Sequence, residues 1–143
     1  AIGEQWATKW EFRETIEQDL TDFARIDLCI VGGITEARKV AGWCETHYIP
    51  IAPHNPLGPV STAACLHLDM ATSNFAVQEC ARPPGTVFPE LFPEQVKLVD
   101  GHLYTNDAPG LGITFNRDAV SAYPPVEGEC PRLSRPDGTF TNW

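Results

Sequence analysis

Four residues with chemically capable side chains recur at nearly regular intervals in the first part of the chain. They are Glu4, Asp27, His54 and Glu79, separated by 23, 27 and 25 residues. Carboxylates and imidazoles commonly serve as general acids and bases. Each interval is about one strand plus one helix, and each residue lies at or near the end of an expected strand. In a (β/α) barrel such strand ends meet at a common rim, where barrels of this kind do their chemistry.

Each residue also has a purely structural explanation, which the sequence leaves open. Glu4 and Glu79 fit solvated charges at strand ends, and His54 fits a surface histidine beside prolines. Asp27 interrupts an apolar run, where a carboxylate must be paired or hydrogen-bonded, and a cap on nearby backbone amides would satisfy it. Taken together, the four structural explanations fit less well than a shared site.

The elements that position these residues follow a strand–helix alternation over the first 80 or so residues, which predicts a parallel sheet. Thr8 and Glu11 have the spacing of a capping box and predict a helix over 8–20. Thr35 is suited to cap a second helix over 35–47. Their apolar sides consist of Phe12, Ile16 and Leu20 in the first helix, and of Ala37, Val40, Ala41 and Cys44 in the second.

Short apolar runs supply the expected strands. Residues 1–4 have the character of a strand end, and 23–31 that of a strand buried on both faces, stopping at a pair of glycines. Further strands are expected over 49–52 and 74–78, with a helix between them that begins at Pro59 and runs to about residue 72. Because no methionine or earlier element precedes the first strand end, we expect the chain to be a piece of a longer protein.

The character of the sequence changes after Glu79, and we expect two units, 1–80 and 81–143. Asp100-Gly101 between two short apolar segments predicts a type I′ hairpin of strands 97–99 and 102–104. The prolines and aromatic residues beyond it, including Trp143, predict an extended tail packed on a domain that is absent here.

Composition limits the classes of partner. The chain has 143 residues, 43% of them apolar, with a net charge of −9 and a pI near 4.7. Such a charge argues against nucleic acid and anionic membrane surfaces as partners, and an anionic substrate would need a local cation. No apolar run approaches the roughly 20 residues of a membrane span. We expect a soluble, cytoplasmic protein whose five scattered cysteines are reduced, namely Cys29, Cys44, Cys65, Cys80 and Cys130.

Five motifs, in order, resemble a known family. The segments 1–4, 26–36, 52–59, 74–79 and 108–113 read AIGE, IDLCIVGGITE, APHNPLGP, NFAVQE and APGLGI. They resemble the C-terminal half of enolase-superfamily enzymes, and most of all the galactonate dehydratase branch of the mandelate racemase subgroup. The resemblance covers essentially the whole chain.

This resemblance implies an α/β fold, the C-terminal half of a (β/α)7β TIM-like barrel comprising strands 5 to 8, with an extended tail and a β-hairpin. Glu4 matches a carboxylate ligand of a magnesium ion. His54 matches a catalytic histidine, Asp27 the acid that hydrogen-bonds it, and Glu79 a carboxyl group that assists the enolate intermediate. To donate a proton to an enolate, Glu79 would need a raised pKa.

The implied reaction is magnesium-dependent dehydration of a sugar acid such as D-galactonate to a 2-keto-3-deoxy acid. Mannonate, gluconate or another sugar acid, a racemase reaction, and a non-catalytic half-barrel acting by association remain alternatives. The other metal carboxylates, the base and the capping domain belong to a preceding N-terminal segment. We therefore expect that half, or a complementary chain, as a partner, and a homo-oligomer for the full-length form.

Overall fold

A computed structural model of the chain describes residues 1–128 and 133–141. Cys130 and Trp143, for which we expected a reduced thiol and a packed tail residue, lie outside the described residues. Within them, Cys29, Cys44, Cys65 and Cys80 are free thiols. Burial raises the pKa of both Cys44 and Cys65 to about 12, so these two thiols are neutral packing groups.

Four extended segments of the first 80 residues lie parallel and adjacent, in the order of the sequence. They are joined by the parallel bridges Ile2 to Ala24, Ala24 to Ile51, Asp27 to His54 and Ile51 to Phe75. Backbone hydrogen bonds such as Ala52 N–H to the Ala24 carbonyl, 3.0 Å, connect neighbouring segments. This order confirms the α/β architecture of successive strand–helix units. The numbering of these strands within a full barrel stays a prediction.

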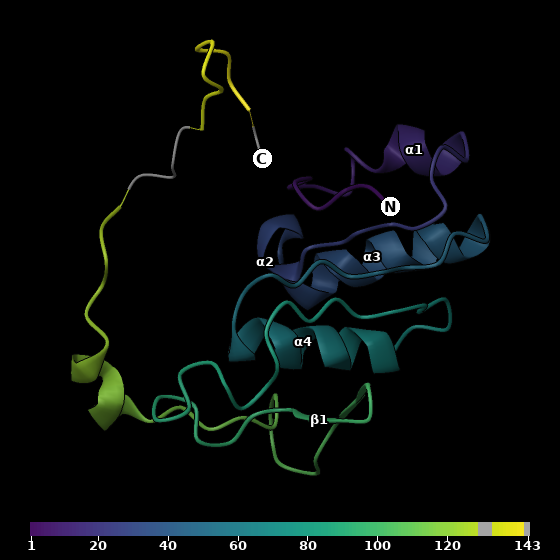
Figure 1. Ribbon diagram of the computed structural model, residues 1–143. Coiled ribbons are helices and arrows are strands. Elements are labelled where there is room, and N and C mark those ends of the chain that lie inside the picture. The colour runs from purple at the N-terminus through teal and green to yellow at the C-terminus, as the bar shows by residue number, and fades with distance from the viewer. Residues whose placement is uncertain (129–132, 142–143) are drawn as a thin grey trace.

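Helices connect the segments and cover one side of the array. They are α1 (Arg13–Glu17), α2 (Leu28–Val31), α3 (Gly33–Thr46) and α4 (Pro59–Met70). Figure 1 shows α3 and α4 running along the extended segments. The core joins the helices to alternate strand residues, and its members include Phe12, Ile16, Ala24, Ile26, Val40, Cys44, Ile51 and Leu68, none more than 1% exposed. The predictions for the second and third helices are confirmed, although α4 ends two residues early.

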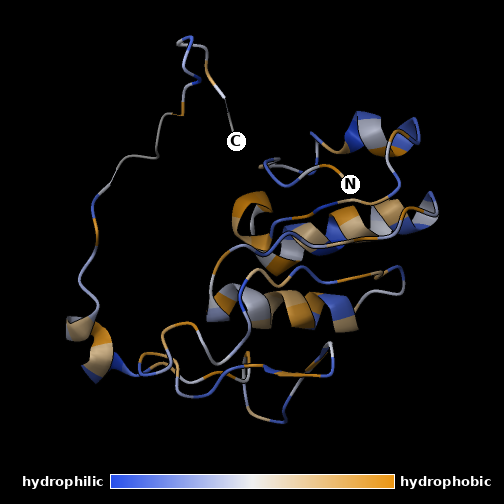
Figure 2. Cartoon of the chain, viewed as in Figure 1, coloured by the Kyte–Doolittle hydropathy of each residue, from blue (hydrophilic) through white to orange (hydrophobic). Residues whose placement is uncertain are grey.

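The strand expected over 23–31 is wrong in its second half, because residues 28–31 form α2. The Asp27 carboxylate accepts hydrogen bonds from the backbone N–H groups of Cys29 (2.7 Å) and Ile30 (3.1 Å), which caps a helix start. Gly32, at φ 108°, then ends this turn in the left-handed region and stands at the N-cap of α3. Gly32, and not Thr35, therefore precedes the second predicted helix. Every residue of α2 is apolar, as Figure 2 shows.

The helix expected over 8–20 is also shorter than predicted. The Thr8 N–H does donate to the Glu11 carboxylate at 2.9 Å, as in a capping box, but regular helix spans only Arg13–Glu17. Asp19, at φ 54°, turns the chain out of the helix, which leaves Leu20 61% exposed. Leu20 is therefore no part of the buried face.

The second half holds little regular structure. The predicted hairpin is confirmed, with β1 (Lys97–Val99) antiparallel to β2 (His102–Tyr104) and positive φ at both Asp100 and Gly101. A 3-10 helix, η1 (Arg117–Ala122), interrupts the expected extended tail. Residues 123–128 then lead away from the helices (Figure 1). Among the described residues, none of the helices is both long and apolar enough to cross a membrane.

Candidate active site

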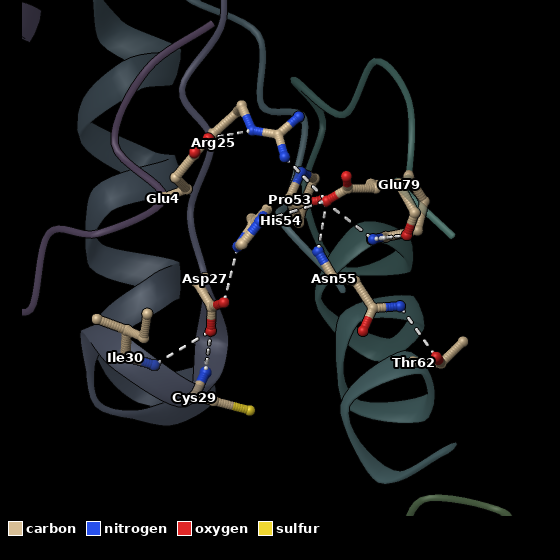
Figure 3. A network of polar contacts seen from close by, with 11 residues as sticks. Glu4, Arg25, Asp27, Cys29, Ile30, Pro53, His54, Asn55, Thr62 and Glu79 are labelled. Carbon is tan, nitrogen blue, oxygen red and sulfur yellow. Dashed lines mark hydrogen bonds and ion pairs between the residues drawn. The ribbon is translucent and has the colours of Figure 1, made fainter. Parts of the chain in front are cut away.

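The four residues singled out in the sequence belong to one connected network at the ends of the four extended segments (Figure 3). Asp27 contacts His54, and His54 faces Glu79. Glu4 joins through Arg25, whose guanidinium group contacts the carboxylates of both Glu4 and Glu79. Since parallel neighbours end at the same edge, residues from four separate segments meet there.

Asp27 has two structural tasks, one for each carboxylate oxygen. Oδ1 accepts the two backbone N–H groups that begin α2, and Oδ2 lies 2.9 Å from Nδ1 of His54. The side chain is only 3% exposed, so the carboxylate is held by hydrogen bonds rather than by water. The cap on backbone amides and the contact with an imidazole are thus both present in the structure.

His54 is oriented by this contact. Because the Asp27 carboxylate can only accept, Nδ1 carries the hydrogen between them, and this fixes which ring nitrogen is free. The free nitrogen, Nε2, lies 3.8 Å from Oε2 of Glu79. The imidazole is 18% exposed, so Nε2 remains within reach of a molecule at the strand ends.

Arg25 is the site residue that the sequence reasoning missed. Its Nη2 donates to Oε2 of Glu79 at 2.9 Å, and its Nε lies 2.8 Å from Oε2 of Glu4 in an ion pair without hydrogen-bond geometry. A signal was available, because residues two apart on a strand share a face. Ala24 and Ile26 point into the core, so Arg25 must share the other face with Asp27.

Hydrogen bonds connect Glu79 and its neighbour Gln78 to the loop that contains His54. The N–H of Asn55 donates to Oε2 of Glu79 at 2.9 Å, and the Asn55 side chain donates to the Thr62 hydroxyl on α4. The amide of Gln78 donates to the carbonyl of Pro53 at 3.1 Å. These bonds couple the last extended segment to the one before it.

The ionisation of Glu79 differs from the expectation. Partial burial acts to raise the pKa of Glu79, but hydrogen bonds from the Asn55 amide and Arg25, with the charges of Arg25 and His54, outweigh burial and lower it. Glu79 is therefore a carboxylate in this structure, and the raised pKa expected for a proton donor is absent. Oε2 accepts from two donors at once, which suits the ionised form.

A magnesium ion would find one hard ligand here and not a complete site. Magnesium prefers six oxygen ligands in near-octahedral geometry. Glu4 offers a carboxylate that is 44% exposed, with one oxygen engaged by Arg25. Within residues 1–128 and 133–141, no group of three or more His, Cys, Asp or Glu side chains could hold a metal ion. The described residues alone therefore do not fit a magnesium site.

Comparison with known proteins gives one family. Residues 1–119 match the family described as enolase C-terminal domain-like. A D-galactonate dehydratase family member from Streptomyces bingchenggensis is 37% identical, with 100% of this chain and 35% of that protein covered. A D-mannonate dehydratase from Caulobacter vibrioides is 36% identical, with 100% of this chain and 36% of that protein covered. The chain thus spans about a third of the length of these relatives.

Solved structures agree with this similarity. An enolase from Agrobacterium radiobacter, bound to sodium and L-malate, superposes with a TM-score of 0.86 at 29% identity, over 96% of this chain and 38% of that one. An enolase from Pantoea ananatis, with bound D-gluconate and magnesium, gives a TM-score of 0.77 at 34% identity, over 82% of this chain and 29% of that one.

Proposed function

Since the chain belongs to the enolase C-terminal domain-like family, we propose that it supplies part of the active site of an acid-sugar dehydratase, a lyase that removes water from a sugar acid. The observation that carries the proposal is the buried Asp27 carboxylate on Nδ1 of His54, which leaves Nε2 facing the strand ends. D-galactonate is the substrate we propose first, with mannonate and gluconate as the nearest alternatives.

His54 is the proposed general acid. Hydroxide is a poor leaving group, so loss of the 3-hydroxyl group needs a proton delivered as the bond breaks. Asp27 supports the protonated imidazole and holds the proton-donating Nε2 toward the substrate side. Asp27 is thus a proposed positioning residue, since Oδ1 and Oδ2 are both engaged by protein groups.

Arg25 supplies the local cation that an anionic substrate requires. It is the positive group in a cluster otherwise made of carboxylates and an imidazole, and it is 24% exposed. A substrate carboxylate arriving at the rim would compete with Glu4 and Glu79 for its N–H groups. We propose that the ionised Glu79 carboxylate accepts a hydrogen bond from a substrate hydroxyl. A bound substrate that displaces Arg25 would raise the pKa of Glu79.

Glu4 is proposed as one magnesium ligand, with the remaining ligands from the part of the fold that longer relatives carry. When bound, the cation would offset the negative charge that develops on the substrate carboxylate as the neighbouring proton is removed. The residues of this chain contribute the acid, its orienting carboxylate and the arginine. The tail beyond residue 80 is proposed to pack on the capping domain, and the full-length form to be a homo-oligomer.

A reconstitution assay tests the proposal. The chain is assayed alone, and mixed with the N-terminal two thirds of the Streptomyces bingchenggensis relative, against a panel of sugar acids with magnesium. We expect 2-keto-3-deoxy product from the mixture and none from either part. A matched mixture with His54→Asn should give at least about 100-fold less product. If wild-type and His54→Asn mixtures yield equal product, the assignment is wrong, and product from no pairing favours a non-catalytic half-barrel.

A further inference from the structure

A second buried carboxylate, outside the hydrogen-bonded network of the candidate active site, has no use in the proposed reaction. Asp69 lies near the end of α4 and is 6% exposed. Both of its carboxylate oxygens are buried, and neither has a hydrogen-bond partner among the described residues. An unpaired charge on a buried carboxylate is destabilising, so such a group is normally paired or neutralised.

Asp69 lines a cavity of about 400 Å3 at the last extended segment. The cavity lies between α4, residues 75–80 and the β1–β2 hairpin, and most of its lining is apolar. The other ionisable groups on it are Cys80 and His102, and His102 Nδ1 is within 2.9 Å of the Asp100 carbonyl. Cys65 lies one turn earlier on α4. Burial and the charge of Asp69 raise the pKa of Cys65, so this thiol is neutral. None of the described residues that line this cavity is a lysine or an arginine.

The segment beside the cavity is an open sheet edge. The parallel bridges run from Ile2 to Phe75 through the four segments, and the described residues continue them no further. Phe75 is 39% exposed and Val77 59% exposed. An edge with exposed apolar residues and free backbone groups is a template for one more strand.

We propose that this edge receives an extended segment from the remaining part of the fold, and that a lysine or arginine of that segment pairs with Asp69. The relatives are about three times as long as this chain, so they carry the chain length needed for such a segment. A charged pair formed in this way would satisfy both carboxylate oxygens, and the segment would cover Phe75 and Val77.

A second copy of this chain is a poorer occupant. A two-fold contact between copies is self-complementary, so each copy presents the same patch to the other. Pairing two such edges would bring two Asp69 carboxylates into one buried interface. The net charge of −9 on each copy adds to this repulsion.

Opposite effects of one substitution, Asp69→Leu, test the pairing without any assay of activity. It is made in this chain and in a chimera in which this chain replaces the 35% of the Streptomyces bingchenggensis relative that it covers. We expect Asp69→Leu to raise the Tm of the chain alone, because it removes an unpaired charge. In the chimera it should lower the Tm by at least about 3 °C, because it leaves the cation unpaired. Asp22→Leu at an exposed acid should shift both proteins alike.

The unsubstituted proteins give a second readout, which decides the matter if a leucine variant fails to fold. Burial raises the pKa of Asp69 to about 7 in this chain. Carboxyl 13C NMR should show its midpoint falling to about 4 or below in the chimera, as expected beside a cation. A midpoint that stays near 7 in the chimera, or a Tm change of the same sign in both proteins, would overturn the proposal. So would a dimer of the chain alone in which Asp69 titrates at about 4.

Discussion

Among the single residues of the site, Arg25 has the central position because it is shared by two carboxylates. Arg25 contacts Glu4 and Glu79, and the Asn55 N–H adds a second donor to the same Glu79 oxygen. Charge-assisted hydrogen bonds of this kind favour the ionised carboxylate. The state of Glu79 is therefore set by its neighbours and changes when they change.

Arg25→Gln should raise the pKa of Glu79, because it removes a hydrogen bond and a positive charge from the carboxylate. Carboxyl 13C NMR at Glu79 would measure this. Arg13→Gln, which breaks the exposed pair with Glu17, is the matched control and should leave Glu79 unchanged. An unchanged Glu79 midpoint in Arg25→Gln would show that the Asn55 amide alone holds the carboxylate ionised.

The same lowered pKa predicts an acid dependence of stability. The folded pKa of Glu79 lies below its unfolded value, so its contribution is present above about pH 4.3 and is lost as pH falls through the folded pKa. Unfolding experiments across this range should show a smaller acid loss for Glu79→Gln than for the wild type. An identical acid loss would contradict the assignment.

His54→Asn, in the reconstituted protein, should reduce dehydration by at least about 100-fold. Exchange of the substrate C2 proton should remain measurable, because the proposed base lies outside this chain. Product formation and deuterium incorporation would be followed on the same samples. Loss of both activities together would show that His54 is not the acid.

At the scale of elements, glycine conformation fixes the approach to Glu4. Gly3 has φ 117°, and a Cβ there would lie 2.5 Å from the Phe12 ring, which is itself buried. Only glycine, which has no Cβ, therefore lets the backbone at position 3 approach Phe12 this closely. This close approach positions the first extended segment, and Glu4 with it, against the helix α1 region.

Gly3→Ala should destabilise the chain by about 2 kcal/mol or more, because the backbone conformation is strained for alanine and the Cβ would meet the buried Phe12 ring. Denaturant unfolding would measure the change. Gly42→Ala, within α3 and with open space around it, is the control and should stabilise by about 0.5–1 kcal/mol. A neutral Gly3→Ala would mean that residues 1–4 are not held against Phe12 in solution.

For the molecule as a whole, the chain carries one proposed metal ligand and an open sheet edge. Glu4 offers a single carboxylate, and the last extended segment ends the described sheet at Phe75. In our proposal, the additional part of the fold completes both features. The relatives, which are about three times as long as this chain, carry such a part.

Magnesium should leave the Tm of the chain alone unchanged within about 1 °C, because one carboxylate does not make an octahedral site. Thermal unfolding with magnesium chloride, against sodium chloride at matched ionic strength, would measure this. A ligand at 100 times its Kd stabilises by about 2.7 kcal/mol, so binding would be visible as a clear rise in Tm. Such a rise in the chain alone, absent in Glu4→Gln, would show a metal site complete within these residues.

Local sequence patterns were enough to predict the alternation of strands and helices, the helices α3 and α4, the Asp100-Gly101 hairpin and the spacing of Glu4, Asp27, His54 and Glu79. These depend on local periodicity, on turn residues and on short-range backbone preference. Residue types alone sufficed to mark Asp27 as a carboxylate in need of a partner.

The remaining features came from the folding of the chain in three dimensions. It ended a strand at Asp27 because the carboxylate caps the next four residues as a helix. It placed Arg25 between two carboxylates, 21 and 54 residues away in the sequence, and so made Glu79 an anion. It also buried Asp69 without a partner. Charge pairing and burial depend on long-range contacts, which the spacing of residues along one chain does not contain.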